Sequence, residues 1–127
     1  MYGVEGKVSL WLGNFNDEET FRNFMEIKYT DDGDSIPSDF KKHFEIKSYD
    51  IDFSEIDYME EEASELEILL EGFSNDYEII PKFKEYFKLG NYNAIVLLYD
   101  FQYEKDIKKY TDKNSFLEYI GCVSYTK

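Results

Sequence analysis

The chain has 127 residues, of which 28 are acidic and 14 basic, so its formal net charge is −14. Such a field repels nucleic acids and anionic membranes and attracts basic proteins, which argues against nucleic-acid recognition through a basic patch. The acidity has two explanations, general solubility and a functional acidic face, and composition alone does not choose between them. The length is typical of one domain, residues 1–127, and a hydrophobic content of 43% is that of a folded protein.

The only cysteine, Cys122, excludes an intrachain disulfide and favours a reducing compartment. Because it lies in an apolar run, we expect a buried structural thiol rather than a nucleophile. The chain does not open with a signal-peptide pattern, and its apolar runs fall short of the roughly 20 residues of a membrane span. We therefore expect a soluble, cytoplasmic protein.

The first predicted element is a strand over residues 7–13. Bulky side chains alternate on both of its faces, which indicates a central strand that is covered on at least one side. The strand carries the only tryptophan, Trp11, which we expect in the core. Gly13 and Asn14 are expected to turn the chain at its end.

Two helices are predicted next. The first covers residues 17–28, where Asn16 and Glu19 form a capping-box pattern and apolar side chains follow at helical spacing. The second covers residues 37–44 and opens at Pro37, a residue type that suits the first helical turn. A loop is expected between the two helices.

Residues 49–58 fit two patterns. Their aromatic and aliphatic side chains alternate with acids as in an edge strand, but some of them also recur at helical spacing. The next two segments, 63–71 and 76–88, predict helices. Gly72 is a suitable C-cap for the former, and Pro81 is expected in or near the first turn of the latter.

Residues 93–103 show the clearest strand pattern, because they are aliphatic, β-branched and uncharged as far as Asp100. Residues 104–115 are polar, and we expect them to connect this strand in a long hairpin to a last strand over 115–126. Gly121 in the last strand is expected to mark a bulge or a close approach. The two strands would be antiparallel. Together the elements predict an α+β domain, a small and mainly antiparallel sheet packed with several helices.

Residues with catalytic or metal-binding chemistry are scarce. His43 is the only histidine, and with Cys122 it cannot supply the several ligands of a zinc site. The sequence contains neither a Walker loop nor a dinucleotide fingerprint. The cluster Asp31, Asp32 and Asp34 is similar to part of a calcium loop, but the glutamate required at its twelfth position is missing. We therefore predict no catalytic residue, no metal site and no cofactor.

A second group of acids is denser. No lysine or arginine lies between Lys47 and Lys82, so like charges repel one another there without local compensation. Two interpretations remain: a solvated face beside the core, or a docking surface in which acids steer a basic partner and aromatic rings such as Tyr49 or Phe53 anchor it. The loop at residues 31–34 is a further candidate contact. The partner-binding residues predicted in the dense group are Asp50, Asp52, Glu55, Asp57, Tyr58, Glu60, Glu61 and Glu62.

Six segments resemble, in their order along the chain, the immunity protein 22 family, and the resemblance covers nearly the whole chain. They are VSLWLGNF (8–15), EIKYTDDGDSIPSDF (26–40), YDIDF (49–53), LLEGFSNDYEIIPKFKE (69–85), NAIVLLYDFQY (93–103) and FLEYIGCVSYT (116–126). Each block alone is short, and their common order makes the resemblance specific. The shared positions look like fold-defining residues and include Trp11, Gly13, Asn14, Phe15 and Pro37.

The resemblance implies a bacterial immunity protein with an α+β fold, of the kind that accompanies polymorphic toxins. Such a protein would bind the catalytic domain of its cognate toxin and block it inside the producing cell, without enzymatic activity of its own. Many such toxins are nucleases, whose phosphate-binding sites are basic, so an acidic inhibitor would complement them. The alternative is a non-enzymatic interaction module for another basic protein. A carboxylate-dependent enzyme would instead require a concave pocket that holds two acids.

Overall fold

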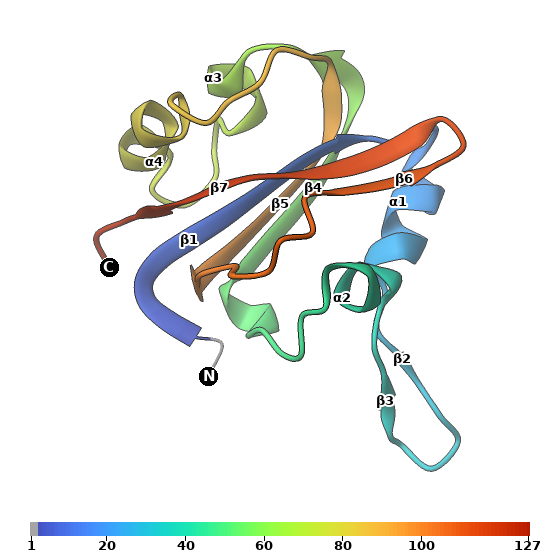
Figure 1. Ribbon diagram of the computed structural model, residues 1–127. Coiled ribbons are helices and arrows are strands. Elements are labelled where there is room, and N and C mark those ends of the chain that lie inside the picture. Colours follow the sequence, from blue (N-terminus) through green and yellow to red (C-terminus); the bar gives the residue numbers. More distant parts are fainter. Residues whose placement is uncertain (1–2) are drawn as a thin grey trace.

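The structure, a computed structural model, describes residues 3–127 (Figure 1). These residues form an antiparallel sheet of five strands in the order β4-β5-β1-β7-β6. A two-stranded hairpin projects from the body. The strands of the sheet are β1 (Gly3–Asn14), β4 (Ser54–Ala63), β5 (Tyr92–Phe101), β6 (Lys109–Asp112) and β7 (Ser115–Ser124), and those of the hairpin are β2 (Lys28–Tyr29) and β3 (Ser35–Ile36).

Within residues 3–127, four short α-helices cover the sheet, two on each face (Figure 1). The pair α3 (Leu66–Leu69) and α4 (Asp76–Phe83) packs on one face. The pair α1 (Glu18–Met25) and α2 (Asp39–Phe44) packs on the other. A single 3-10 turn, η1 (Ile51–Phe53), leads into β4. The longest of these helices has eight residues, and none in the described part of the chain could cross a membrane.

The sheet is buried on both faces because side chains of its central strands alternate between two hydrophobic cores. In β1, Leu10 and Leu12 belong to the core under α3 and α4, whereas Trp11 between them belongs to the core under α1 and α2. In β5, Leu97 and Val96 divide in the same way. Each such aliphatic side chain contributes about 1.5–3 kcal/mol relative to an exposed position. The prediction of a central first strand is therefore confirmed.

Trp11 lies at the centre of the second core and is completely buried. Its ring meets those of Phe40, Phe44 and Tyr103 edge-on, at centroid distances of 5.2, 5.9 and 5.3 Å. Such aromatic pairs contribute about 0.5–1.5 kcal/mol beyond the burial of their area. The expectation that Trp11 is a core residue is confirmed, and Phe40 and Phe44 both lie on the buried face of α2.

The end of β1 differs from the prediction. Gly13 and Asn14 do not turn the chain, because β1 continues through both and pairs there with its neighbours β5 and β7. An added Cβ on Gly13 would lie 2.1 Å from the carbonyl oxygen of Phe116. The glycine therefore serves a close approach of two strands, and the turn comes after it.

The first two helices begin at caps other than the predicted ones. α1 follows Asp17 rather than Asn16, since the Asp17 carboxylate accepts a hydrogen bond from the N–H three residues on, at 2.7 Å. α2 follows Ser38, whose hydroxyl accepts the equivalent bond at 3.1 Å, so Pro37 precedes the cap. α1 ends at Met25 and not at residue 28, because β2 has already begun there.

The helices predicted at 63–71 and 76–88 are shorter than expected. Ala63 still belongs to β4, where it pairs with β5, so α3 is a single turn. Gly72 adopts a φ of +88° a few residues after α3, at the end of a turn. α4 ends at Phe83, and Pro81 lies in its second turn rather than its first.

The segment 49–58, which fitted both strand and helix, contains the turn η1 and the first half of β4. The predicted hairpin between 93–103 and 115–126 is wrong, because β1 lies between β5 and β7 and pairs antiparallel with each. The two strands therefore run parallel to one another and not antiparallel as expected. β7 forms its hairpin instead with β6, inside the segment that we expected to be a polar connection, and Lys113 adopts a φ of +55° in the tight turn. A register shift against β1 confirms the bulge next to Gly121.

The α+β class is confirmed in outline, with more strand than helix (40% against 23%). The strand order has one consequence for function. It leaves β4 and β6 as the edges of the sheet, so each of them has one side that no strand of the sheet covers.

Candidate functional site

The edge strand β4, together with η1 before it, carries the densest group of acids in the chain. We call residues 50–65 the acidic edge. Of its eight carboxylates seven are exposed, and only that of Glu55 is half-buried. The acids are Asp50, Asp52, Glu55, Asp57, Glu60, Glu61, Glu62 and Glu65.

Hydrogen bonds fix three of these acids at the start of the edge. Asp50 Oδ1 accepts from the N–H of Asp52 at 2.9 Å and so caps η1. The Glu55 carboxylate accepts from the N–H and the hydroxyl of Ser74 at 2.9 and 3.2 Å, which ties β4 to the turn between α3 and α4. Asp57 Oδ1 accepts from the N–H of the following residue at 2.9 Å.

A bulge displaces the middle of the acidic edge from the sheet. Tyr58 pairs with Ala94 and Ala63 pairs with Tyr92, so residues 59–62 lie opposite a single residue of β5. Bulges of this kind bend a strand and redirect its side chains. The three consecutive glutamates in the bulge are exposed, and the carboxylate of the last one accepts a hydrogen bond from Asn14 at 2.9 Å.

The charge of the acidic edge is almost uncompensated. Among residues 3–127, only one cation reaches these eight carboxylates: Arg22 Nη2 of α1 lies 4.0 Å from Asp57 Oδ1, at the outer limit of an ion pair. The same guanidinium pairs at 3.2 Å with Glu18 of its own helix. The carboxylates of the edge therefore repel one another and present a negative field to any approaching protein.

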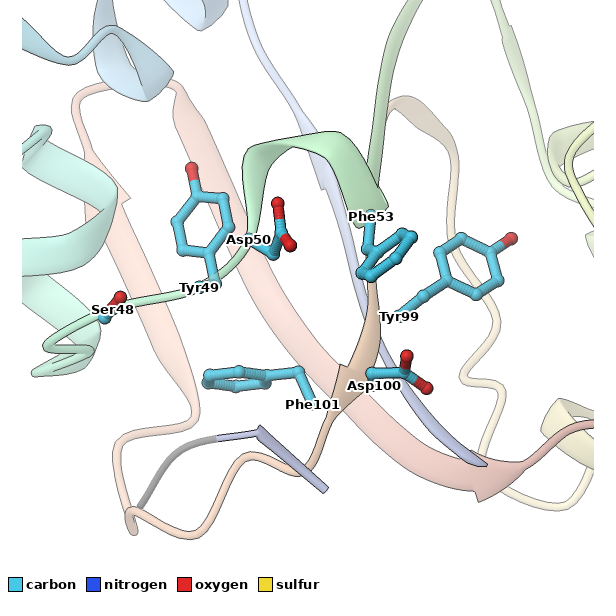
Figure 2. A pocket seen from close by; sticks show the side chains of 7 residues that line it. All are labelled: Ser48, Tyr49, Asp50, Phe53, Tyr99, Asp100 and Phe101. Carbon is cyan, nitrogen blue, oxygen red and sulfur yellow. The ribbon is translucent and has the colours of Figure 1, made fainter. Parts of the chain in front are cut away.

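An open hollow of about 510 Å³ lies where η1 meets the end of β5 (Figure 2). Figure 2 shows the rings of Tyr49 and Phe101 on one side and those of Phe53 and Tyr99 on the other. Asp50 and Asp100 supply carboxylates to its lining, together with Ser48. Phe53 is 50% exposed, so its ring is accessible to a partner without any rearrangement.

The chain places a cation of its own beside this hollow. Lys127 Nζ lies 2.8 Å from Asp100 Oδ2 and 5.8 Å from the centre of the Phe53 ring. Burial alone would raise the pKa of the Asp100 carboxyl, but hydrogen bonds from Lys127, from the Tyr125 hydroxyl and from the Gly6 N–H together lower it. A carboxylate and an aromatic face therefore already bind an ammonium group at this rim.

Tyr58, one of the predicted partner-binding residues, is half-buried rather than exposed. Its ring lies 6.3 Å from that of Phe21 in α1 and packs against the second core. Burial, and then the nearby carboxylate of Asp17, raises the pKa of Tyr58. Phe53 is the more accessible aromatic side chain of the acidic edge.

The acids of the predicted loop, Asp31, Asp32 and Asp34, occupy the exposed tip between β2 and β3. Gly33 at this tip has a φ of +89°, and the Thr30 N–H donates to the Asp34 carbonyl oxygen at 2.8 Å. Figure 1 shows the hairpin projecting beyond α2, away from β4, so the structure does not bring this loop to the acidic edge. Within residues 3–127, no group of three or more acids, histidines or cysteines is arranged to hold a metal ion.

Besides Ser48, the sequence patterns miss three residues of the hollow, Tyr99, Asp100 and Phe101. They come from the end of β5, far along the chain from η1. One local signal marks them, because Asp100 is the first charge after the long hydrophobic run and adopts a φ of +56°. Their place beside η1 depends on the β4–β5 pairing, which a sequence pattern does not contain.

Comparison with known proteins agrees with the resemblance seen in the sequence. Residues 8–126 match the protein family described as Immunity protein 22. No curated protein and no solved structure gives a significant match. The family match supports, in general terms, a toxin-neutralising role with a toxin as the partner and without enzymatic activity. Because the match covers nearly all of its length, this chain belongs to the immunity protein 22 family.

Proposed function

We propose that this protein neutralises the catalytic domain of a cognate bacterial toxin by stoichiometric binding, and that the acidic edge is the surface that contacts the toxin. The observation that carries the proposal is the uncompensated charge: the eight carboxylates of the acidic edge, five of them on the edge strand β4, share a single ion pair at 4.0 Å within residues 3–127. Self-repulsion of this kind costs stability, and a basic partner would relieve it.

The electrostatics suit an inhibitor that has to act quickly. Long-range attraction between opposite charges raises association rates above the values of about 10⁵–10⁷ M⁻¹s⁻¹ that are typical of neutral surfaces. A cell that makes its own toxin needs such fast capture in its cytoplasm. The half-exposed Phe53 supplies an apolar anchor next to the charges, a combination that is common at the centre of strong interfaces.

The charge also favours one class of toxin. A nuclease must hold phosphate groups, so the surface around its catalytic site is basic. An acidic edge that occupied this surface would take the place of the nucleic acid and prevent substrate binding. On this proposal the toxin is a nuclease, and inhibition is occlusion rather than chemistry.

Co-expression of this protein with the toxin domain encoded beside it tests the function. We expect the cells to survive, and purified inactivated toxin domain to form a one-to-one complex with the protein. Death of the co-expressing cells would refute the proposed neutralisation. Loss of protection without loss of the complex would show that binding occurs away from the toxin's active site.

Charge reversal tests the surface. Replacing Glu60, Glu61 and Glu62 with lysine should slow association by about tenfold or more at low salt and weaken its salt dependence. The bulge holds these side chains outside the core, so the fold should tolerate the change. A matched control reverses the exposed acids Glu104, Asp106 and Asp112, which lie on and before β6 at the opposite edge of the sheet. Equal effects of the two triple variants on the association rate would show that the acidic edge is not part of the interface.

A further inference from the structure

We propose that the partner of the acidic edge binds by adding a β-strand to β4, and that the carboxylates along β4 admit a basic strand and reject a second copy of this chain. This inference rests on the proposed function and specifies how the surface is used. It starts from the main chain of β4 rather than from its charge.

The hydrogen bonds of β4 show which main-chain groups face outward. The Tyr58 N–H donates to the carboxylate of Asp57 at 2.9 Å, so it does not point to β5. Main-chain groups of a strand alternate in direction. The N–H and carbonyl of Ile56 therefore also point outward, away from β5, whereas those of Glu55 and Asp57 point to β5. Ile56 lies at the centre of the regular part of the β4–β5 ladder, which runs from residue 54 to residue 58.

The pairing of β5 with β1, on its other side, leads to the same assignment of the outward main-chain groups of β4. The Asn93 side chain accepts from the Phe15 N–H and donates to the Phe15 carbonyl oxygen, so Phe15 turns its main chain toward β5. Because main-chain groups alternate in direction along a strand, those of Trp11 also point to β5, where Trp11 pairs with Val96. The main-chain groups of Val96 are therefore bonded to β1, and those of its neighbour Ile95 point toward β4.

The outward groups of β4 are only partly occupied by the chain itself. The Ser54 N–H donates to the Ile51 carbonyl oxygen as η1 ends, and the Tyr58 N–H is taken by Asp57. Between them, the Ile56 N–H and carbonyl have no hydrogen-bond partner on that side among residues 3–127. A strand laid alongside would pair with them as β5 does on the opposite side.

There is also room for such a strand. An open hollow of about 410 Å³ runs along four consecutive residues of β4, 54–57. Its other wall is the turn Glu71–Phe73 after α3. A neighbouring strand needs a lateral spacing of about 4.8 Å, and Ile56, the residue with the unpaired main-chain groups, belongs to the lining of this hollow. The aromatic hollow of Figure 2 is a separate hollow before the start of β4, and Phe53 belongs to its lining.

The opposite edge of the sheet is protected in a different way. β6 has only four residues, and the His43 ring nitrogen Nε2 lies 2.8 Å from the Lys109 carbonyl oxygen, so α2 covers part of that edge. Proteins commonly protect edges by shortening, covering or charging them. β6 is short and covered, whereas β4 has ten residues: a bulge interrupts it at 59–62, and its regular part, 54–58, carries charge as its protection.

Protection by charge is selective. Two acidic edges brought side by side would place like charges directly opposite one another, which opposes pairing of two copies. A strand carrying lysine or arginine would reverse the sign of these contacts. Lys127, held between Asp100 and the Phe53 ring, shows that a cation is accepted beside η1, just before β4 begins.

Amide hydrogen exchange tests the strand addition directly. The probe is the toxin domain encoded beside this protein, carrying an inactivating substitution, and NMR follows individual amides in the free protein and in the complex. We expect protection of the Ile56 amide to rise about tenfold or more on binding. The amides of Glu55 and Asp57 are internal controls, since their bonds to β5 protect them already in the free protein.

The outcomes are distinguishable. If no complex forms, the proposed function fails and this inference fails with it. If the complex forms and the Ile56 amide exchanges as before, strand addition is overturned while toxin binding stands. Protection confined to the amides of residues 60–62 would likewise overturn it, because the acids would then bind without the edge.

Self-association tests the selectivity without any toxin. The variant E55Q/D57N/E60Q removes three charges, and its amides keep one oxygen each that can accept from the Ser74 N–H and from the Tyr58 N–H. We expect its dimerisation constant, measured by sedimentation equilibrium, to exceed that of the parent by about tenfold or more. The control variant E104Q/D106N/D112N should behave like the parent. If the β4 variant does not associate more strongly than this control, charge is not what keeps copies apart, and that part of the proposal is refuted.

Discussion

Gly13 shows at the scale of one residue why β1 can pair on both sides. It lies within β1, opposite Ala94 of β5 and Leu117 of β7. An added Cβ would meet the Phe116 carbonyl oxygen at 2.1 Å and the Leu117 Cα at 2.9 Å, and both are backbone atoms that cannot move away alone. Glycine is needed here for space between strands and not for an unusual φ.

Replacing Gly13 with alanine should therefore destabilise the protein by about 2–4 kcal/mol, because β1 and β7 would have to separate. Urea unfolding of the parent and the variant measures this difference. Gly33→Ala is the control: Gly33 has a φ of +89° but open space around it, so we expect only about 1–2 kcal/mol from backbone strain. Similar losses for the two variants would contradict the proposed close approach.

At the scale of elements, Glu78 joins α4 to the chain beyond β7. Its carboxylate accepts from the N–H and the hydroxyl of Thr126 at 2.9 and 3.0 Å and pairs with Lys82 at 3.2 Å. Lys82 in turn donates to the Ser124 carbonyl oxygen at 2.8 Å. The hydrogen bond from the Thr126 N–H is the main cause that lowers the pKa of Glu78, which falls to about 2.

This low pKa predicts a pH dependence of stability. A carboxyl whose pKa is lower in the folded state stabilises the fold above its unfolded pKa, near 4.5, and loses that contribution as the pH falls toward 2. The melting temperature of Glu78→Gln should lie below that of the parent at pH 7, and the gap should close between pH 4.5 and 2. Glu71→Gln, in the exposed turn after α3, should melt with the parent at every pH. A gap that stayed constant down to pH 2 would contradict the role given to the Glu78 charge.

How far the sequence predicts these elements depends on where their information lies. β5 was predicted because an aliphatic, β-branched run is a local property, and Trp11 was placed in the core for the same reason. β6 was missed because residues 109–112 are polar and become a strand only through their hairpin with β7. The order of strands in a sheet depends on which distant segments pair, and the residue pattern along one strand does not specify its partner. Periodicity therefore did not predict that β5 pairs with β1 instead of β7.

The candidate site divides in the same way. The acids of residues 50–65 were identified from their density along the chain, and the structure places them on an edge strand. Asp100 and Tyr99 complete the hollow beside η1 only because β4 pairs with β5. The acids at the β2–β3 tip were grouped with the edge by charge alone, and the structure separates them. Local composition thus identified the acidic segment, and the tertiary fold formed the hollow beside it.

At the scale of the whole molecule, a net charge of −14 acts against the compact state. Added salt screens this repulsion, since the Debye length falls from about 30 Å at 0.01 M to about 8 Å at 0.15 M. We expect the free energy of unfolding to rise by on the order of 1 kcal/mol over this range. Urea unfolding at the two salt concentrations measures the rise. The triple lysine variant at residues 60–62 should show a smaller one, and a fall in stability with salt would contradict the prediction.

The central place of β1 also sets the order in which the protein can be built. A ribosome releases β1 before its partners β5 and β7, so Trp11 finds Val96 and Tyr119 only after the residues between them have emerged. Until then an apolar strand remains without a sheet, and pairing between such distant segments is slow. Residues 54–63 reach their edge position only when β5 joins them. The protein could then bind its toxin only after β7 has been synthesised and the sheet is complete. This favours making the protein ahead of its toxin.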